Sequence, residues 1–367
     1  MPKTVVAAMS GGVDSSAAAA LLKEQGYNVI GITLNVWPRE ETACARTCCS
    51  ITDVDDARMV CSKLGIPHYV LNMRDTFKKS VIDYFVDEYM LGRTPNPCIA
   101  CNEHVKFKAM MKKAEALGAD YIATGHYATI EHNNITNEYL LHRSFDIHKD
   151  QTYVLYMLTQ NQLSKILLPC GGYDKKQVRA IAEKYELPTF KKPDSQDLCF
   201  IGAGGYAGFI RKNCSALARP GDLIDSTGHV IGRHDGIYNF TIGQHKGLGK
   251  FSNEKLYVTE INAQSAQVFV GKNEELFASE MLVEDMKYML SGHIIDGQAT
   301  KVKIRYNSPE ADAVTHFLPD GRLKVIFAKP QRAITPGQAA VFYKHDVVLG
   351  GGVIAQSFKN SEWGLKQ

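Results

Sequence analysis

The sequence predicts an α/β protein in which a doubly wound parallel sheet is followed by smaller, mostly β regions. From Thr4 to Thr124, short apolar runs alternate with amphipathic or alanine-rich runs, which is the pattern of consecutive βα units. Two adjacent glycines, Gly11 and Gly12, lie between the first predicted strand and the first predicted helix, and they allow a tight turn there. Near residue 205 the pattern changes to short runs separated by Gly and Asp turns, which is typical of antiparallel β structure.

The N-terminal region, residues 1–204, contains the predicted parallel sheet. Its expected strands are residues 4–8, 28–34, 68–71 and 121–124. Its expected helices are residues 15–24, 52–64, 76–90, 105–117, 152–168 and 175–185. Since ligands of such sheets bind beyond the carboxyl ends of the strands, the loops after the first and last of these strands are the expected ligand-binding loops. Gly125, in the second loop, allows a nucleotide to approach the backbone, and His126 either contacts a phosphate or base or has a structural role.

Two β regions are expected to follow. The central region, residues 205–276, has predicted strands at residues 221–225, 230–232, 256–261 and 267–270, and a glycine-rich basic loop at residues 241–250. The C-terminal region, residues 277–367, is expected to form a small antiparallel β-barrel with strands at residues 301–306, 323–328 and 339–343. Residues 301–306 alternate between charged and apolar side chains. The outward Lys301, Lys303 and Arg305 either face an RNA backbone or keep the barrel soluble.

Composition and charge narrow the class of protein. The chain has 367 residues, 45% hydrophobic and 22% charged, which is typical of a soluble globular protein with two or three domains. It has no apolar run long enough to span a membrane and no signal-peptide pattern, so we expect a cytosolic protein. Nine cysteines, an odd number, argue against a disulfide framework and for catalytic, redox or metal roles. The net charge is only +3, but residues 93–113 and 143–192 each carry an excess of four positive charges, which suits a phosphate backbone or a solvated helix face.

The loop from Ala8 to Ser16, with the sequence Ala-Met-Ser-Gly-Gly-Val-Asp-Ser-Ser, is the strongest candidate for a phosphate site. Backbone amides at a helix N-terminus attract anions, and this loop precedes the first predicted helix. It lacks the Gly-Lys-Ser/Thr of a Walker-A loop, so we expect it to hold a pyrophosphate that leaves after attack on an α-phosphate. Asp14 is then a candidate ligand for the accompanying Mg²⁺. The alternative is an ordinary strand-to-helix turn capped by Ser10 or Asp14. The string SGGVDS resembles the signature of the PP-loop ATP pyrophosphatases.

A second informative stretch runs from Thr94 to Asn102, with the sequence Thr-Pro-Asn-Pro-Cys-Ile-Ala-Cys-Asn. Its two prolines stiffen the loop, and Cys98 and Cys101 follow in C-x-x-C spacing before a basic helix. This spacing permits a redox dithiol, half of a zinc site, or ligands of an iron–sulfur cluster. The group Cys44, Cys48 and Cys49 is a weak candidate for a partner. Cys199 is a better one, because it lies in a polar loop between Asp197 and Phe200.

Seven segments, taken in chain order, resemble motifs of the bacterial and organellar tRNA-specific 2-thiouridylases. They are SGGVDSS, TPNPCIACN, ATGHY, KDQTY, KPDSQDLCFIG, TIGQHKGLG and PGQAAVFY, and they span the chain from Ser10 to Tyr343. SGGVDS is shared with GMP synthetases and argininosuccinate synthetases, whereas its combination with the TPNP loop and the late cysteine is specific. The resemblance implies that ATP adenylates the C2 oxygen of the wobble uridine of tRNA. A persulfide sulfur then replaces that oxygen, and AMP and pyrophosphate are released.

The resemblance also implies roles for individual residues. It places ATP on Ala8, Met9, Ser10, Gly11, Gly12, Val13, Asp14 and Ser15, with Leu34 and Gly125 at the adenosine part. It places the target base on Asn96, Pro97 and Cys98, and the rest of the tRNA anticodon arm on His126, Lys149, Asp150, Gln151, Arg305, Tyr306 and Gln338. Cys199 would carry the persulfide, and Cys101 would be the other catalytic thiol, which closes a transient disulfide with Cys199. A cysteine desulfurase or a sulfur relay protein would supply the sulfur.

Alternatives remain open at this point. Members of this family carry either Asp or Cys at the position of Cys98, and with Cys the three thiols Cys98, Cys101 and Cys199 could hold a [4Fe–4S] cluster. In that case the cluster, rather than a persulfide, would deliver the sulfur. Two other functions share the SGGVDS loop: a PP-loop ligase or amidotransferase that acts on a metabolite, and an RNA-binding protein whose loop is vestigial. Neither gives a use for the two cysteine loops.

Overall fold

The computed structural model describes residues 1–36, 51–194, 198–202, 204–214, 219–249 and 254–359. Cys44, Cys48, Cys49 and Asp197 lie outside the described residues. The chain forms two compact units. The first comprises Met1–Ile82, Pro97–Gly202 and Asp346–Val348, and the second comprises Asp83–Asn96, Ala203–His345 and Leu349–Gln367. In the part of the chain that is described, no helix combines the length and the apolar character needed to cross a membrane.

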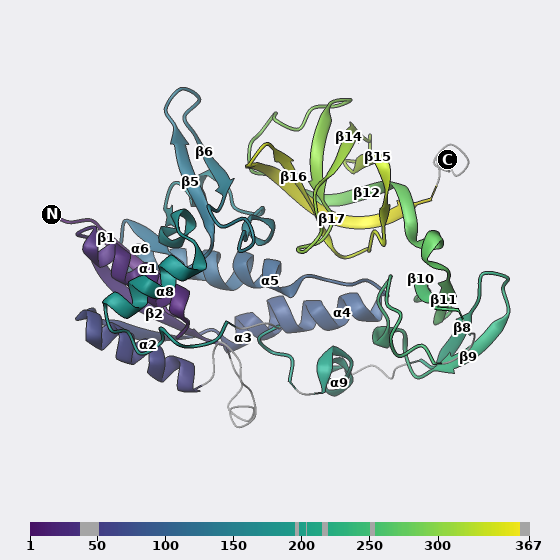
Figure 1. Ribbon diagram of the computed structural model, residues 1–367, viewed down its shortest axis with the longest axis horizontal. Helices are drawn as coiled ribbons and strands as arrows, with labels where there is room; N and C mark the ends of the chain where they lie inside the picture. Colours follow the sequence, from purple (N-terminus) through teal and green to yellow (C-terminus); the bar gives the residue numbers. More distant parts are fainter. Residues whose placement is uncertain (37–50, 195–197, 203, 215–218, 250–253, 360–367) are drawn as a thin grey trace. The chain divides into compact units, whose positions relative to one another are not determined.

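The first unit is built on a parallel sheet with the strand order β3-β2-β1-β4-β7, of which Figure 1 labels β1 and β2. Its strands are β1 (Thr4–Ala8), β2 (Asn28–Asn35), β3 (His68–Asn72), β4 (Tyr121–Ala123) and β7 (Ile166–Leu167). The doubly wound parallel sheet predicted from the sequence is therefore confirmed, with β7 as an additional edge strand. The strand order reverses between β1 and β4, and ligands of such sheets bind beyond the carboxyl ends of the strands at this reversal.

Alanine-rich and amphipathic helices cover this sheet. They are α1 (Val13–Glu24), α2 (Ile51–Leu64), α6 (Lys108–Ala116) and α8 (Lys175–Lys184). The small side chains of Ala17, Ala18, Ala19 and Ala20 are all buried, which allows α1 to pack closely against β1, β2 and α8. Strand residues such as Val5 and Val29 form one core cluster with Leu22 of α1, Val60 of α2 and Ala182 of α8.

Two helical stretches contain a π-helical turn. The helix predicted at residues 76–90 consists of α3 (Arg74–Phe77), the π turn η1 (Lys78–Asp83) and α4 (Tyr84–Met90). The helix predicted at residues 105–117 starts earlier than expected, with α5 (Pro97–Ala100) and the π turn η2 (Cys101–Phe107) ahead of α6. Because π turns occur frequently at functional sites, η2, which starts at Cys101, is a candidate functional segment.

The prediction of a single helix at residues 152–168 is wrong. The segment contains the 3-10 turn η3 (Thr152–Val154), the short helix α7 (Gln160–Leu163) and strand β7. Residues 152–158 are all buried, so their apolar side chains do not mark one face of a helix. Thr159 then begins α7 with a capping box that it shares with Gln162. The antiparallel hairpin of β5 (Ala128–Asn133) and β6 (Glu138–Arg143) was not predicted; Asn137 in its turn has a φ of 56°.

The second unit contains the two β regions expected from the sequence. The central sheet follows helix α9 (Gly205–Asn213) in the chain and has the order β10-β11-β8-β9. Its first two strands in the chain are β8 (Gly221–Ile224) and β9 (Val230–His234). Its predicted strand pair is β10 (Tyr257–Asn262) with β11 (Gln267–Gly271), which run antiparallel. The C-terminal strands form a barrel of order β12-β15-β14-β13-β16-β17, which the pairing of β12 with β17 closes. The barrel strands are β12 (Phe277–Tyr288), β13 (Ala299–Lys303), β14 (Ala311–Phe317), β15 (Leu323–Arg332), β16 (Ala339–Lys344) and β17 (Val347–Phe358).

The strand predicted at residues 301–306 ends earlier than expected, at Lys303. Arg305 and Ser308 form a turn in which the Ser308 amide donates to the Arg305 carbonyl and the Ser308 hydroxyl accepts from the Arg305 amide. Among the three cations expected to point outward, Lys301 pairs with Asp312 on β14 at 2.8 Å, and the Lys303 ammonium lies 5.7 Å from the centre of the Tyr306 ring. Arg305 is half-buried and donates to the Arg332 carbonyl at 2.9 Å. These contacts tie the cations to the barrel itself.

Candidate active site

The loop between β1 and α1 is shaped by its glycines and serines. Gly11 has a φ of +71°, and a Cβ at this position would lie 2.2 Å from the Asp53 carbonyl oxygen, so only glycine fits. Gly12 is the N-cap of α1 and no side chain caps the helix, which argues against the plain capped turn. The Ser15 hydroxyl accepts from the Ser10 amide at 3.2 Å and donates to the Gly12 carbonyl at 3.0 Å, so the loop is closed by its own serines. The first amides of α1, which a helix leaves without internal acceptors, remain aimed at the loop.

The end of β4 packs directly against this loop. A Cβ at Gly125 would lie 2.7 Å from both the Asp14 carbonyl carbon and the Ser15 amide nitrogen. The sequence predicted that Gly125 allows a nucleotide to approach the backbone. That stays a prediction; in the structure the missing side chain allows the backbone of Asp14 and Ser15 to approach, at the point where the strand order reverses.

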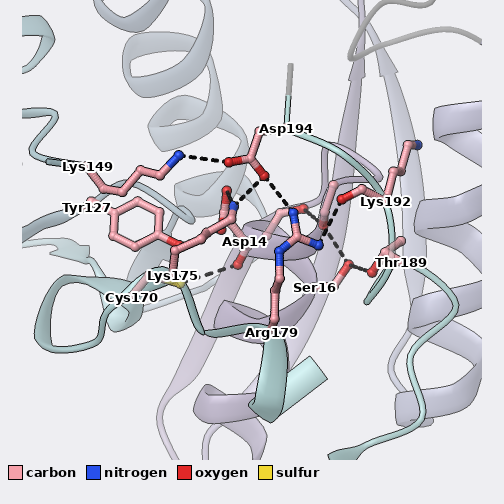
Figure 2. Close-up of polar contacts among 12 residues, drawn as sticks. Asp14, Ser16, Tyr127, Lys149, Cys170, Lys175, Arg179, Thr189, Lys192 and Asp194 are labelled. Atoms are coloured by element: carbon pink, nitrogen blue, oxygen red, sulfur yellow. Dashed lines mark hydrogen bonds and ion pairs between the residues drawn. The ribbon is translucent and has the colours of Figure 1, made fainter. Parts of the chain in front are cut away.

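Asp14 lies at the centre of a charged cluster (Figure 2). The Lys175 ammonium is 2.7 Å and 2.9 Å from the two Asp14 carboxylate oxygens, and the Tyr127 hydroxyl donates to Asp14 Oδ1 at 2.6 Å. Lys175 also lies 2.8 Å from Asp194 Oδ1, so one lysine joins two carboxylates that are far apart in the sequence. Burial, followed by the neighbouring Asp14 carboxylate, raises the pKa of the Tyr127 hydroxyl, which therefore stays neutral and donates.

Asp194 is held by three cations in the same cluster. Lys149 contacts Asp194 Oδ2 at 2.9 Å, and Arg179 contacts Oδ1 at 3.0 Å, in addition to Lys175. Burial alone would raise the pKa of this carboxyl, but the hydrogen bonds from Lys149 and Lys175 outweigh it and lower the pKa to about 2. Asp194 is therefore ionised at neutral pH, and it lies five positions before Cys199 in the chain.

A second lysine holds the loop from its other side. Lys192 donates to the Gly11 carbonyl at 3.0 Å and pairs with Asp53 and with Asp56, the latter at 2.6 Å. The Thr189 hydroxyl donates to the Ser16 hydroxyl at 2.9 Å, and the Cys170 thiol contacts the Asp14 carbonyl (Figure 2). The segment from Thr189 to Asp194 therefore packs along one side of the loop and the start of α1.

The remaining residues predicted to hold the nucleotide divide into exposed and core positions. Ser10 is exposed, and Ala8, Gly12 and Asp14 are half-buried, so these are accessible to a ligand. Met9 and Val13 are buried, and the Met9 amide donates to the Ile32 carbonyl at 2.8 Å. Leu34 is half-buried near the carboxyl end of β2, which lies next to β1. Met9 and Val13 can thus serve a nucleotide only through their backbone.

The three predicted thiols occupy different environments in the first unit. Cys98 is exposed in α5, Cys101 is half-buried at the start of η2, and Cys199 is half-buried. The next residue, Phe200, is buried and packs edge-on against Phe77 with ring centres 5.9 Å apart, which anchors the segment after Cys199. Among the described residues, which include all three thiols, no group of three or more His, Cys, Asp or Glu side chains is arranged to hold a metal ion. A ready-made ligand set for an iron–sulfur cluster is therefore not present in this part of the chain.

The stiff loop before these thiols is held by the sequence around Gln338. The Gln338 side-chain amide donates to the Thr94 carbonyl at 2.8 Å, and the Thr94 amide donates to the Pro336 carbonyl at 2.8 Å. Gly337 has a φ of +90° and lies against the Thr94 backbone, which leaves no room for a Cβ. Gln338 was expected to contact tRNA, and in this structure its amide supports the loop that was expected to contact the target base. Asn96 is half-buried at the end of that loop, and Pro97 is buried as the first residue of α5.

The other residues expected to contact tRNA are only partly exposed. His126 is 9% exposed, bonded to the Thr124 hydroxyl at 2.7 Å and stacked on Phe107; burial followed by the charge of Lys106 lowers its pKa. It therefore fits the structural role that the sequence left open. Asp150 is 6% exposed and accepts from the Thr152 hydroxyl, and the Gln151 side-chain oxygen accepts from the Tyr127 amide. Lys149 is bound to Asp194, and Arg305 and Tyr306 are half-buried on the barrel.

Sequence reasoning gave no role to several side chains of this site, among them Tyr127, Lys175, Arg179, Lys192 and Asp194. Lys192 and Asp194 lie in the quoted segment KPDSQDLCFIG, but only its cysteine was given a role. Lys175 is the first residue of α8, directly after the N-cap Asp174, whose capping box with Gln177 fixes the helix start. Nothing in the spacing of these residues indicates that they meet, because Lys175 is 161 positions away from Asp14.

Comparison with known families matches three consecutive segments. Residues 3–203 match the family described as tRNA methyl transferase HUP domain, and residues 208–272 match the tRNA methyl transferase PRC-barrel domain. Residues 278–354 match the aminomethyltransferase beta-barrel domain.

Curated relatives cover nearly the whole chain. The tRNA-specific 2-thiouridylase MnmA of Acetivibrio thermocellus is 50% identical over 355 residues, which is 96% of this chain and 99% of the relative. The tRNA-specific 2-thiouridylase MnmA 2 of Caldanaerobacter subterraneus subsp. tengcongensis is 49% identical over 358 residues, 97% of this chain and 98% of the relative. Among solved structures, a 4-thiouridine synthetase in complex with RNA and ATP is a distant match, with a TM-score of 0.35 and 16% identity over 54% of this chain and 45% of that one.

Proposed function

Since this chain belongs to the family of tRNA-specific 2-thiouridylases, we propose that it is an ATP-dependent tRNA sulfurtransferase that converts the wobble uridine into 2-thiouridine. The observation that carries the proposal is the loop from Ser10 to Ser15 at the reversal of strand order, closed by its own serines and surrounded by lysines. We assign ATP and sulfur chemistry to residues 1–204. We assign binding of the tRNA anticodon arm to residues 205–276 and 277–367, together with the basic segments of the first region.

The first step of the proposed reaction activates the base. A uracil C2 carbonyl is a poor electrophile, so its oxygen attacks the α-phosphorus of ATP and pyrophosphate leaves. We assign the binding of phosphate oxygens to the backbone amides of Gly11, Gly12 and Val13 at the N-terminus of α1. Reaching C2 requires the base to leave its stack, and the stiff Pro95-Asn96-Pro97 segment is the proposed wall of its pocket.

Magnesium accompanies ATP in the proposal, but we assign it no protein ligand. The sequence pointed to Asp14 because carboxylates suit this ion. In the structure, both Asp14 oxygens contact Lys175, and one also accepts from Tyr127. This donor set is already satisfied, and a metal ion would have to displace the lysine.

The second step transfers sulfur. The terminal sulfur of a persulfide on Cys199 attacks C2, and AMP leaves with the former C2 oxygen. The Cys101 thiolate then attacks the Cys199 sulfur, the S–S bond breaks, and its electron pair stays on the sulfur bound to C2. The result is 2-thiouridine and a Cys101–Cys199 disulfide, which a thiol reductant reopens before a cysteine desulfurase or relay protein reloads Cys199. A thiolate or persulfide is a strong nucleophile near neutral pH, which suits this step.

The test of the proposed activity is a direct assay of the product. With unmodified tRNA, ATP, Mg²⁺ and a persulfide donor, we expect one 2-thiouridine, one AMP and one pyrophosphate per tRNA, measured by nucleoside mass spectrometry and phosphate chromatography. Pyrophosphate release without tRNA is expected to be much slower. A chain that releases pyrophosphate with a small metabolite and ignores tRNA would instead be a PP-loop ligase or amidotransferase. A chain that binds tRNA but shows no ATP–pyrophosphate exchange would be an RNA-binding protein.

The persulfide and cluster routes predict different absorption spectra for the purified protein. We expect anaerobically purified protein to be colourless and active, because the described thiols are not gathered as cluster ligands. The measurement is an absorption spectrum with an iron assay, followed by the thiolation assay before and after treatment with an iron chelator. A broad band near ~400 nm, bound iron and loss of activity on chelation would instead assign a [4Fe–4S] cluster to Cys98, Cys101 and Cys199.

A further inference from the structure

We propose that Lys175 is the residue that binds the departing pyrophosphate, which deepens the proposed function and rests on it. The SGGVDS loop contains no lysine, whereas a Walker-A loop supplies one from its own sequence to the phosphates. In this fold a lysine reaches the loop from α8 (Figure 2). Its chemical partner would be the β- and γ-phosphates of ATP, and then free pyrophosphate.

The position of Lys175 is fixed by its surroundings. Its side chain is only 15% exposed, and its ammonium lies within 2.7–2.9 Å of three carboxylate oxygens, two on Asp14 and one on Asp194. The ammonium also lies 5.8 Å from the centre of the Tyr127 ring. Because Asp14 is the second residue of α1, this arrangement holds the ammonium beside the helix N-terminus, where the unpaired amides attract an anion.

Lys175 can exchange a carboxylate for a phosphate while each carboxylate keeps another hydrogen-bond donor. If it turns toward a phosphate, Asp194 keeps its contacts with Lys149 and Arg179. Asp14 keeps the hydrogen bond from the Tyr127 hydroxyl. Removing the partner of a buried charge is normally costly, so this reserve of contacts lowers the cost of the exchange.

Two other cations of the site, Lys192 and Arg179, hold the backbone around the loop, and Lys149 contacts Asp194. Lys192 donates to the Gly11 carbonyl and pairs with Asp53 and Asp56. Arg179 donates to the carbonyls of Phe190 and Lys192 as well as to Asp194. Turning either side chain to a phosphate would break bonds to the backbone, whereas Lys175 gives up only contacts with carboxylates.

The chemical step is balanced without a further reactant. The uridine C2 oxygen forms a bond to the α-phosphorus, and the bond between that phosphorus and the bridging oxygen of the β-phosphate breaks. The electron pair of the broken bond stays on the bridging oxygen, which leaves as part of pyrophosphate. Lys175 remains protonated throughout and donates hydrogen bonds to the oxygens on which negative charge increases.

The experiment compares Lys175→Met with Lys176→Met, an exposed neighbour on the same helix. Binding of inorganic pyrophosphate and of AMP is measured by isothermal titration in EDTA, so that no divalent ion contributes. Loss of a hydrogen-bonded charge is expected to weaken pyrophosphate binding about 10- to 100-fold in Lys175→Met. AMP binding in Lys175→Met, and both ligands in Lys176→Met, are expected to stay within about 3-fold of the unmodified protein. Equal loss of pyrophosphate and AMP, or no loss, would overturn the inference.

A double variant separates phosphate binding from support of Asp14. If Lys175 served only to neutralise Asp14, the double variant Asp14→Asn/Lys175→Met would regain pyrophosphate binding, and this result would overturn the inference. We expect it to regain the thermal unfolding temperature lost in Lys175→Met but not the affinity for pyrophosphate. A different result would overturn the proposed function itself: unmodified protein that shows no ATP–pyrophosphate exchange with tRNA. Normal exchange in Lys175→Met would refute only the role of the lysine.

Discussion

Replacing Cys199 by serine is expected to abolish 2-thiouridine formation, with a loss of at least about 10³-fold, because a serine cannot carry a persulfide. Cys199 is half-buried and precedes Phe200, whose ring packs on Phe77. Exchange of one sulfur for oxygen leaves this packing in place, so the variant is expected to fold. Binding of tRNA and ATP–pyrophosphate exchange are expected to stay within about 3-fold of the unmodified protein, since activation precedes sulfur transfer.

The matched control for this variant is Cys214→Ser. Cys214 is also partly exposed, follows α9 in the second unit and has no role in the proposed reaction. It is expected to thiolate at the unmodified rate, measured by nucleoside mass spectrometry after single-turnover reactions. Thiolation by Cys199→Ser at a rate near that of Cys214→Ser would remove Cys199 from the reaction. Loss of exchange together with thiolation would mean that the serine disturbs the activation site as well.

Most of the fold could be predicted because its signals are local. β1 occurs at the predicted residues, and α1 and α2 differ from prediction only at their first turns. These elements combine a short apolar run or an alanine-rich run with clear turn residues on either side. The helix prediction for residues 152–158 failed for the opposite reason. All of these residues are buried, so no alternation of polar and apolar side chains shows whether the segment is helical.

The site was predicted only in part, and again the local signals were recognised whereas the long-range contacts were not. The loop from Ala8 to Ser15 is continuous in sequence, so its glycines and serines could be recognised as a phosphate site. Lys175 and Asp194 meet Asp14 only through the packing of α8 and the segment after it, and single lysines and aspartates are too common to be singled out. Asp14 itself was assigned to a metal ion because the sequence shows a carboxylate without its partners. Gln338 was predicted to contact tRNA, and in the structure its side-chain amide donates a hydrogen bond to the Thr94 carbonyl.

Adding one methyl group at Gly125 is expected to disable ATP activation while the rest of the protein stays folded. The new Cβ would lie 2.7 Å from backbone atoms of both Asp14 and Ser15, closer than any real Cβ contact, and neither atom belongs to a flexible side chain. The loop must therefore move away from β4. Such overpacking costs roughly 1–3 kcal/mol, which corresponds to a loss of about 5- to 150-fold in ATP affinity if the cost falls on the loop conformation that binds the nucleotide.

The comparison that isolates this effect is Gly172→Ala, where a Cβ would meet no atom within 4 Å. Both variants gain the same methyl group and the same loss of backbone freedom, so their difference reports the contact with the loop. Gly125→Ala is expected to lose ATP binding in isothermal titration and ATP–pyrophosphate exchange in parallel, while tRNA binding stays unchanged. Gly172→Ala is expected to match the unmodified protein in all three measurements. If Gly125→Ala also matched the unmodified protein, the loop backbone would have moved away from the new methyl group at no cost in free energy. The fixed position of Asp14 and Ser15 beside β4 would then not be required for activating the uridine.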